Sequence, residues 1–584
     1  MMSEINPQEN EAQAPEGTPT VKLKLVTPMV LILIQTAAIV YSLRAATVFQ
    51  NAIGLYIVPI VVVIGLAIWW LRAKHVSKRD RIGGLLLFIA LLLLVAVTHT
   101  GVGSRLVVGT LPALTTTIVV FLSITASMAW SSRRLITIAA MVACTAYFTA
   151  LRVDDIGGNL TPIVSWRWTE PPVPADAAWA SETQEPTRSI TLPAQSGPGD
   201  WAEFRGGNRD SRLSDVTFST DWDSDPPKEL WRRKVGLGWS SFTVIGAYLF
   251  TQEQRGQDEV VVCYEVATGN QMWASPISER FDEAMGSGPR ATPTFHEGSL
   301  YTMGATGIVQ ALNASNGETL WQRDLKKDTN AKIPVWGFSS SPLIVNDMVI
   351  VFAGDPNGKS VVAYDLKSGD VRWTSGEGKH GYVSVQLNTL ADVPQLLISS
   401  DIGIQSFAPD TGEKLWEHLW QVSTNPRCVQ PMVPDGNSVL IGTAGGKGTR
   451  KLRIENENGQ WTVSEDWTTR KFKPYFNDFV FYEDHFYGFD GKRLMCIDAS
   501  TGERVWRGSN YGGQILLIED MGLLLILSEK GNIALLKATP EGQEEITSIK
   551  AIEGKTWNHP VIADGKLFVR NSLEAVCYEL DVTS

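Results

Sequence analysis

Cysteine is scarce in this chain of 584 residues, and the scarcity excludes several kinds of site. The five cysteines form no CxxC or CxxCH pair, which argues against a zinc ribbon or a covalently attached c-type haem. Cys263, Cys496 and Cys577 recur at the same place in three sequence repeats. Equivalent positions in neighbouring repeats lie roughly 10 Å apart, too far for a disulfide. We therefore expect buried free thiols.

Recognisable catalytic motifs are also missing. There is no GxSxG nucleophile motif, and the glycine-rich run 442–448 lacks the Walker spacing and the strand-to-helix context of a phosphate loop. His380 and His559 do not have the i,i+4 spacing of a helical metal site. The sequence thus assigns no catalytic residue and no metal ligand, and it favours a non-enzymatic protein without deciding the question.

Basic residues are fewer than acidic ones over most of the chain. Residues 153–584 hold 39 Lys and Arg against 57 Asp and Glu, whereas residues 1–152 hold 12 against 5. A net charge of −18 over the larger part argues against nucleic acid as a partner.

Long apolar runs lie near the N-terminus. A polar tail at 1–20, which we expect to be disordered, is followed by five apolar segments. Most of them approach the roughly 20 residues needed to cross a bilayer, and their near lack of ionisable residues favours an anchor over a transporter. The sequence predicts a membrane domain of five transmembrane helices within 21–152. The segments are approximately 25–43, 52–71, 82–100, 106–130 and 135–151.

The number of lysines and arginines alternates between high and low along the successive connections of these segments. Nine lie on the side of the N-terminus and three on the other side, which predicts a cytoplasmic N-terminus by the positive-inside rule. Five spans then place residues 152–584 outside the cytoplasm, which in a bacterium means a periplasmic domain held on the inner membrane. The proline-rich stretch 153–200 is predicted to be an extended linker. Trp166 and Trp168 form either an interfacial anchor or a short packed turn.

Tight turns and tryptophans recur through residues 201–584. The stretch Cys496–Trp506 has an alternating apolar run, a Thr501-Gly502 turn and a final tryptophan, a pattern typical of two strands joined by a turn. The matching tryptophans, from Trp231 onward, are 39 to 52 residues apart. Periods of roughly 40–50 residues with several strands each are typical of β-propeller blades. We expect these repeat tryptophans to be structural: Trp273, Trp321, Trp373, Trp416, Trp467 and Trp506.

Counting the strand-rich units gives an all-β eight-bladed β-propeller over 201–584. The last unit, Asn558 to Leu580, has only three strands, and we expect Glu229–Val235 to supply the fourth, which closes the ring and removes a free sheet edge. Seven blades stay possible, because the fifth and seventh units are degraded. The units are 240–276, 291–325, 339–375, 381–420, 428–468, 475–507, 513–549 and 557–580.

The repeated turn-and-tryptophan pattern resembles the pyrroloquinoline quinone (PQQ) propeller repeats, over about residues 229–580. That resemblance implies one of two branches, the quinoprotein dehydrogenases or the non-enzymatic BamB-like propellers. The stretch Trp201–Asn208 is also similar to the segment that opens many BamB-like proteins. A five-span anchor before an external propeller is the plan of the membrane-bound glucose dehydrogenases. However, the compact blades, the lack of a vicinal cysteine pair and the lack of a matching Glu/Asn/Asp calcium triad depart from the dehydrogenase branch.

Residues of unusual type precede the innermost strand of each blade, on the face opposite the Thr-Gly turns. Aromatic and cationic groups converging there in a funnel suit an anionic planar ligand or a peptide; channel plugging and loop packing are the alternative. The stretch at 201–210 is either a binding loop around Arg205 or an N-terminal latch. The candidates are Arg205, Trp239, Arg290, Trp336, His380, Arg427, Tyr475, Tyr511, Trp557 and His559.

Two functions follow from these observations. The first is a membrane-anchored extracytoplasmic scaffold that binds protein or peptide and needs no cofactor. The alternative is a dehydrogenase that uses PQQ with calcium to oxidise an alcohol or sugar and passes the electrons to membrane quinone. The lipid bilayer is an expected partner in both.

Overall fold

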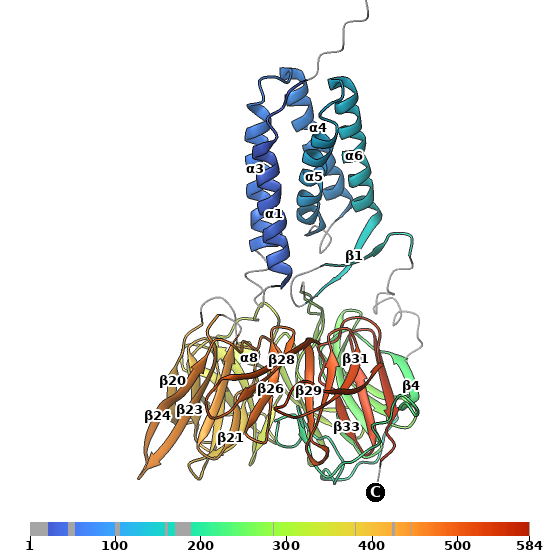
Figure 1. Ribbon diagram of the computed structural model, residues 1–584. Coiled ribbons are helices and arrows are strands. Elements are labelled where there is room, and N and C mark those ends of the chain that lie inside the picture. Colours follow the sequence, from blue (N-terminus) through green and yellow to red (C-terminus); the bar gives the residue numbers. More distant parts are fainter. Residues whose placement is uncertain are drawn as a thin grey trace, which may run out of the picture. The chain divides into compact units, whose positions relative to one another are not determined.

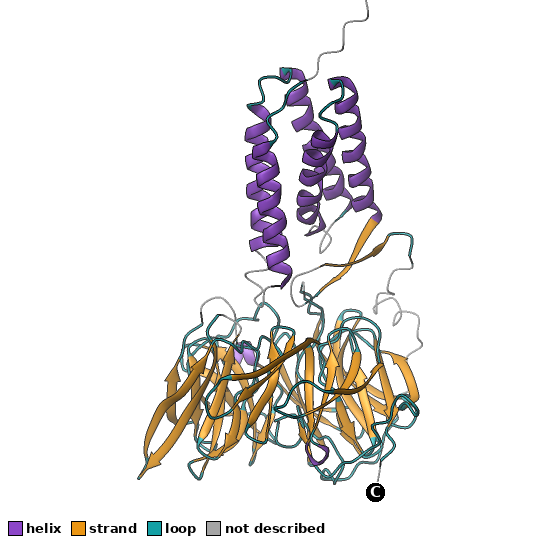
Figure 2. Ribbon diagram, viewed as in Figure 1, coloured by secondary structure: helices purple, strands orange, loops and turns teal. Residues whose placement is uncertain are grey.

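The computed structural model divides into two compact units, residues 1–171 and 172–584. The first is mainly helical and the second consists mainly of strands (Figures 1 and 2). The predicted tail at 1–20 and His380 lie outside the residues that the structure describes. Those residues are 21–44, 53–99, 105–157, 162–169, 188–283, 285–379, 381–422, 427–443 and 446–582.

The first unit contains a helix at each of the five predicted apolar segments. Two helices are long and apolar enough to cross a membrane, Ile53–Leu71 and Lys78–Thr98, and Val26–Ser42 and Gly109–Ile124 are shorter apolar helices. The structure thus supports two candidate spans rather than five. The helices are α1 (Val26–Arg44), η1 (Ile53–Ile57) continuing into α3 (Val58–Leu71), α4 (Lys78–Thr98), α5 (Arg105–Ile124) and α6 (Trp130–Ala150).

The stretch predicted as a linker, 153–200, is not one continuous tether. Its start belongs to an antiparallel hairpin of β1 (Leu151–Ile156) and β2 (Pro162–Trp166). Trp166 and Trp168 stack with their ring centroids 4.8 Å apart, as in a short packed turn. Its far end packs on the propeller, where Ile190 is buried among apolar residues of the first two blades.

The second unit consists of eight four-stranded antiparallel blades, so the count of eight is confirmed. We call the strands of a blade A to D from the innermost outward. β3 (Arg212–Leu213) is an additional short strand beside the seventh blade. The first four blades are β5–β8 (Thr243–Glu279), β9–β12 (Thr294–Asp324), β13–β16 (Leu343–Ser375) and β17–β20 (Gln386–Leu419). The other four are β21–β24 (Met432–Thr469), β25–β28 (Val480–Asn510), β29–β32 (Gly513–Lys550) and β33–β35 (Val561–Glu579) with β4.

The ring closes as predicted. Strand β4 (Lys228–Lys234), from the start of the propeller, pairs antiparallel with β35 (Glu574–Glu579) and becomes the outermost strand of the eighth blade. Trp231 of β4 then donates its indole N–H to the carbonyl of Val266 in the first blade, at 2.7 Å. The two ends of the propeller are thus held together by both a sheet ladder and an indole.

In the sixth blade, one aspartate organises the Thr-Gly turn, and a tryptophan of the preceding blade packs against its glycine. Asp498 accepts the N–H groups of Ser500 and Thr501. These bonds and the hydroxyls of the same two residues hold the pKa of Asp498 at about 2. Gly502 follows with φ of +71°, and a Cβ on it would lie 2.5 Å from the ring of Trp467. The turn therefore needs glycine for its backbone and for the neighbouring indole.

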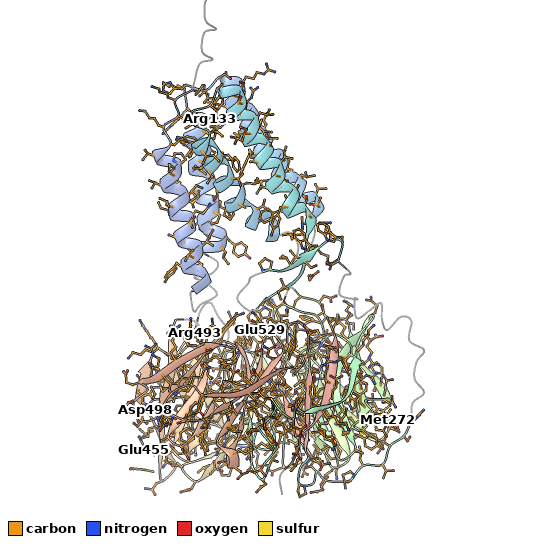
Figure 3. The ribbon with its side chains drawn as sticks, turned by 45° about the vertical axis from the view of Figure 1, so that its right-hand side comes forward. Arg133, Met272, Glu455, Arg493, Asp498 and Glu529 are labelled. Carbon is orange, nitrogen blue, oxygen red and sulfur yellow. The ribbon has the colours of Figure 1, made fainter. Side chains whose placement is uncertain are left out.

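The two faces of the ring differ in the loops that they carry. One face, here the DA face, has the loops from strand D to the next strand A and those from B to C; the other, the CD face, has the A–B and C–D turns. Figure 3 shows this separation, with Arg493 and Glu529 at one side of the ring and Asp498 and Glu455 at the other. All five cysteines are free thiols, and Cys263, Cys496 and Cys577 are buried as predicted.

A belt of hydrogen bonds joins the starts of all eight A strands. From the first to the sixth blade, a backbone N–H in one blade donates to a side-chain oxygen in the next; from the sixth back to the first, a side-chain amide donates to a backbone carbonyl. Because every blade takes part, the belt fixes the DA end of the ring independently of the tryptophans. The pairs are Ser241–Thr292, Thr292–Ser341, Ser341–Ser384, Ser384–Gln430, Gln430–Asp478, Asn477–Gly513, Gln514–Trp557 and Asn558–Ser240.

Candidate functional site

The segment 199–215 enters and leaves the ring at the CD face. At its start, the carbonyl of Gly199 accepts from Asp564 N, and the Asp200 carboxylate accepts from Gly246 N; Asp564 and Gly246 lie in the A–B turns of the eighth and first blades. At its end, Asp215 N donates to Asp520, which follows strand A of the seventh blade. Both ends are therefore fastened to the same face.

Between these ends the segment crosses the axis of the ring. The Arg209 guanidinium donates to the carbonyls of Ser341 and Pro342 in the third blade, at 2.8 and 2.9 Å. Ser211 O accepts from Leu517 N in the seventh blade. The third and seventh blades lie on opposite sides of the ring. A segment this short can contact both of them only by occupying the central channel. We call residues 199–215 the plug.

The plug reaches the hydrogen-bond belt through a buried ion pair. Arg205 is 2% exposed, and its Nε lies 3.3 Å from Oδ2 of Asp478 and 2.8 Å from Oγ of Ser211. His559 lies 3.4 Å from the same carboxylate oxygen, and its ring meets that of Phe204 edge to face. Burial alone would raise the pKa of Asp478, but Arg205, His559 and the N–H of Gln430 lower it below its usual value.

Above this ion pair, half-buried aromatic residues form an arc on the DA face. Trp239 of the first blade packs on Trp557 of the eighth, with centroids 4.7 Å apart, and Phe476 of the sixth blade packs on Trp557 at 5.3 Å. Tyr475 contacts Phe476. The Lys555 ammonium lies over the rings of both Trp557 and Trp239, at 4.3 and 5.0 Å. The planes of Trp239 and Phe476 are tilted by 36° and 53° against Trp557, so the rings form an uneven aromatic surface with a cation over two of them.

The arc continues over the third and fourth blades. Burial, with Cys428 and Tyr382 nearby, raises the pKa of Tyr475. The hydroxyl oxygen of Tyr382 accepts the backbone N–H of Trp336 at 3.0 Å, and the two rings lie 4.8 Å apart. We call these six residues the aromatic arc: Trp239, Trp336, Tyr382, Tyr475, Phe476 and Trp557.

Several predicted site residues lie elsewhere or are already engaged. Arg205 is buried inside the plug beside Asp478, which agrees with the latch interpretation of 201–210. Arg427 is buried against the carbonyls of Ser400 and Trp420, and burial, together with Arg450, lowers its pKa to about 10. Arg290 pairs with Glu283 of its own loop at 2.9 Å. These guanidinium groups serve the fold of the ring.

The structure adds residues that the sequence did not single out. Tyr382 and Phe476 complete the arc, Lys555 supplies its cation, and Asp478 anchors the plug. Tyr382 and Phe476 are close in sequence to predicted positions and carry the same chemical signal. The role of Asp478 could not be predicted, because a single aspartate before a strand looks the same in the sequence as any other loop aspartate.

The residues of the channel do not fit a calcium ion with PQQ. Calcium needs six to eight oxygen ligands that converge on one point. In the part of the chain that the structure describes, no group of three or more His, Cys, Asp or Glu is arranged to hold a metal ion. The Asp478 carboxylate is engaged by Arg205, and the plug occupies the axis.

Comparisons with known proteins identify one matching family and several similar solved structures. Crystal structures that resemble the chain include BamB from Moraxella catarrhalis (14% identity, TM-score 0.45, 61% of this chain and 100% of that one). Two quinohemoprotein alcohol dehydrogenases also resemble it. ADHIIG from Pseudomonas putida HK5 has 14% identity and a TM-score of 0.48, over 68% of this chain and 84% of that one. The enzyme of Comamonas testosteroni has 13% identity and a TM-score of 0.46, over 70% of this chain and 85% of that one. A comparison with curated proteins finds no match. The family described as "Outer membrane protein assembly factor BamB" matches residues 222–377 and 400–583. Because these matches cover more than half of the sequence, the chain belongs to this BamB family of PQQ-repeat propellers.

Proposed function

We propose that this protein is a membrane-anchored, extracytoplasmic propeller that binds a protein or peptide segment on its DA face. The observation that carries the proposal is the aromatic arc. Its six rings are half-buried rather than sealed in the core, and such aromatic residues dominate the energetics of protein interfaces. The family description names a protein-assembly factor, which favours a protein partner over a small molecule.

The anchor in this proposal consists of all five helices, although two alone meet the length and hydropathy of a span. A neighbouring helix that buries its polar groups against the bundle needs less hydrophobicity than an isolated one. Gln35 of α1, for example, donates to the hydroxyl of Thr115 in α5 at 3.2 Å. The nine-to-three distribution of basic residues supports a cytoplasmic N-terminus and a periplasmic propeller. Fusions of alkaline phosphatase after residue 152 and after residue 584 test this topology: activity of both supports it, and loss of both contradicts it.

The DA face has further apolar residues next to the arc. Val335 is 80% exposed and Ile333 is 40% exposed, in the loop that leads to the third blade and carries Trp336. Exposed aliphatic side chains beside half-buried rings form the kind of patch that marks a protein interface. Below the arc the plug occupies the channel, so we propose that a partner rests on the face and does not thread through the ring.

The alternative, a PQQ-dependent dehydrogenase, receives no support from the residues of the channel. It is tested by incubating the purified full chain with PQQ and calcium and measuring dye-linked oxidation of alcohols and sugars. We expect no stoichiometric binding and no oxidation. Saturable one-to-one binding with dye reduction would replace the scaffold proposal by the enzyme.

Removing the two indoles at the centre of the arc should weaken partner binding without unfolding the ring. We expect the double substitution Trp239→Ala and Trp557→Ala to reduce in-cell crosslinking of the partner by at least about tenfold, since buried interface tryptophans contribute about 2 kcal/mol or more each. Crosslinks are formed from a photoreactive amino acid placed at Val335 and detected as a shifted band.

The matched control is Trp461→Ala, which removes an indole from the outermost strand of the fifth blade. It should leave the crosslinked band unchanged. An unchanged band in the double variant, or equal loss in both variants, contradicts the proposed interface. Thermal unfolding of each variant separates loss of binding from loss of fold.

A further inference from the structure

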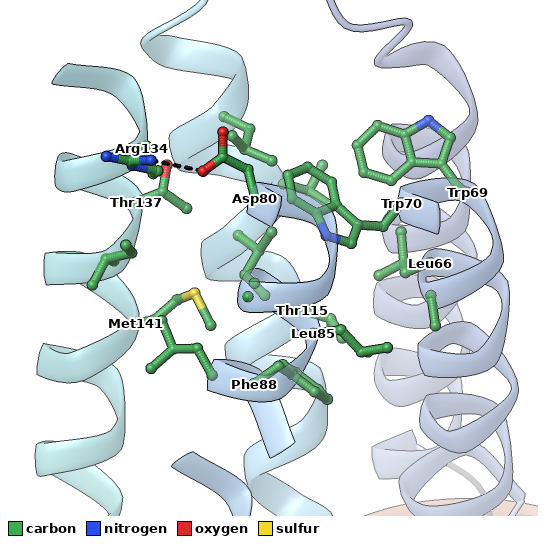
Figure 4. A pocket seen from close by; sticks show the side chains of 18 of the residues that line it. Leu66, Trp69, Trp70, Asp80, Leu85, Phe88, Thr115, Arg134, Thr137 and Met141 are labelled. Carbon is green, nitrogen blue, oxygen red and sulfur yellow. Dashed lines mark hydrogen bonds and ion pairs between the residues drawn. The ribbon is translucent and has the colours of Figure 1, made fainter. Parts of the chain in front are cut away.

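The helical unit contains a cavity of about 610 Å³ between helices α3, α4, α5 and α6. Figure 4 shows Leu66, Leu85, Phe88 and Met141 along its length and Asp80 with Arg134 at one end. Its volume lies within the roughly 300–1,000 Å³ typical of small-molecule sites. The cavity therefore has an apolar body and a polar, charged end.

The cavity exists because the apolar contacts of the bundle form two separate clusters. Ile32, Val62 and Val119 join α1, α3 and α5, whereas Leu91, Leu114 and Met141 join α4, α5 and α6. Facing α3, helix α4 has two successive glycines. A Cβ on Gly83 would meet no atom within 4 Å, and one on Gly84 would lie 3.3 Å from the ring of Trp70. Gly83 lines the cavity on its exposed side, so the missing side chain leaves space there.

The charged end is organised by Asp80. Its carboxylate accepts from Trp130 Nε1 at 2.9 Å, from Arg134 at 2.6 Å, and from Ser77 Oγ at 2.9 Å. Trp70 donates its indole N–H to the carbonyl of Arg81 at 2.8 Å. These bonds satisfy the carboxylate, so the remaining charge at the cavity end is positive. Arg79 also lines the cavity and forms no ion pair within the described part of the chain.

The surroundings of this end are strongly basic. The connection from α3 to α4, the first turn of α4 and the start of α6 together hold seven Lys and Arg against Asp80 alone. Trp69, Trp70 and Trp130 lie next to one another there, with successive centroids 6.0 and 6.5 Å apart. Tryptophans beside basic residues mark the boundary between headgroups and acyl chains, and basic clusters on the cytoplasmic side attract anionic lipids.

We propose that this cavity binds one lipid with an anionic headgroup, whose acyl chain lies between α3 and α4. Arg79 and Arg134 would hold the headgroup, since Arg134 is 52% exposed and can contact it while remaining beside Asp80. The chain would lie along Leu66, Leu85, Phe88 and Met141. The inference rests on the membrane placement proposed above.

The experiment uses the full chain purified in mild detergent and mixed with equal amounts of phosphatidylglycerol and phosphatidylcholine. Native mass spectrometry counts the lipids retained. We expect one phosphatidylglycerol to be kept in preference to phosphatidylcholine. Gly83→Leu fills the cavity and should lower its retention by about tenfold, because the side chain displaces several buried methylene groups of the acyl chain.

The matched control is Gly109→Leu. Gly109 is also a helix glycine on which a Cβ would meet no atom within 4 Å, but it does not line the cavity, so retention should not change. The pair Arg79→Gln and Arg134→Gln leaves the cavity open and should abolish the preference between the two lipids. An excess of inorganic phosphate should displace nothing, because the acyl chain supplies much of the binding.

Equal retention of the two lipids by the unsubstituted protein, unchanged retention in Gly83→Leu, or displacement by phosphate alone would overturn the proposal. Extraction of cell membranes with alkaline carbonate tests the membrane placement separately. Release of the protein by carbonate contradicts that placement, whereas a membrane-retained protein that fails to discriminate lipids contradicts only the lipid site.

Discussion

The substitution Trp273→Ala should lower the free energy of unfolding of the propeller by about 3–5 kcal/mol, the range typical of removing a buried tryptophan. Trp273 is fully buried, and it packs with residues of both the first and the second blade. Its indole N–H donates to the carbonyl of Ala314 at 3.2 Å. A Cβ on Gly317 would lie 2.6 Å from its ring. Alanine would therefore leave a cavity between blades and an unpaired carbonyl.

Two phenylalanine variants separate packing from hydrogen bonding. Trp273→Phe keeps most of the buried area but loses the bond to Ala314, worth about 1 kcal/mol net. Trp373 occupies the same place in the third blade, but its Nε1 finds no acceptor among the described residues. Trp373→Phe should therefore cost less than Trp273→Phe. Guanidinium denaturation of the full chain in detergent, followed by tryptophan fluorescence, gives the midpoints; equal costs in the two variants would contradict the role of the bond.

The blades could be predicted from sequence because their determinants are local. The turn at Asp498–Gly502 needs an acceptor side chain and a glycine within five residues, and the following tryptophan has a fixed offset from that turn. Closure by β4 was also predictable, since an eighth unit with three strands leaves an unpaired edge and the first strand has no blade of its own.

The site was predictable only in part, because it is made by contacts distant in sequence. The positions before each A strand indicated where aromatic residues gather, and Trp239 and Trp557 meet there although they are 318 positions apart. Residue type alone could not separate a cation on the surface from one inside the ring. Arg205 and Arg427 have the same chemistry as an exposed ligand-binding arginine, but their partners lie in other blades or loops.

The plug also stabilises the propeller, and its sequence belongs to none of the repeats. Arg205, Arg209 and Ser211 all have positive φ values, of 65°, 55° and 58°. Such backbone is costly for residues other than glycine and persists where surrounding contacts impose it. In this segment the contacts come from the inner strands of several blades, so the plug and the ring stabilise each other.

Removing the Asp478 carboxylate, which holds the plug, should destabilise the propeller as much as removing the Trp273 indole. We expect Asp478→Ala to lower the free energy of unfolding by about 3–5 kcal/mol, because it leaves the buried Arg205 without its counter-charge. It also removes the acceptor of Gln430 N and so opens the belt between the fifth and sixth blades. The control is Asp466→Asn, which breaks an exposed pair with Arg453 and should cost no more than about 1 kcal/mol.

The dependence on pH identifies the charge as the cause. Despite burial, the pKa of Asp478 is lowered from 3.8 by Arg205, His559 and Gln430 N–H. A carboxylate with a lowered pKa in the folded state stabilises the fold above its unfolded pKa, and this stabilisation is lost as pH falls through the folded value. The difference in unfolding free energy between the unsubstituted chain and Asp478→Asn should therefore shrink as pH falls below 3.8. A difference that stays constant on acidification would show that packing, and not the ion pair, holds the plug in the channel.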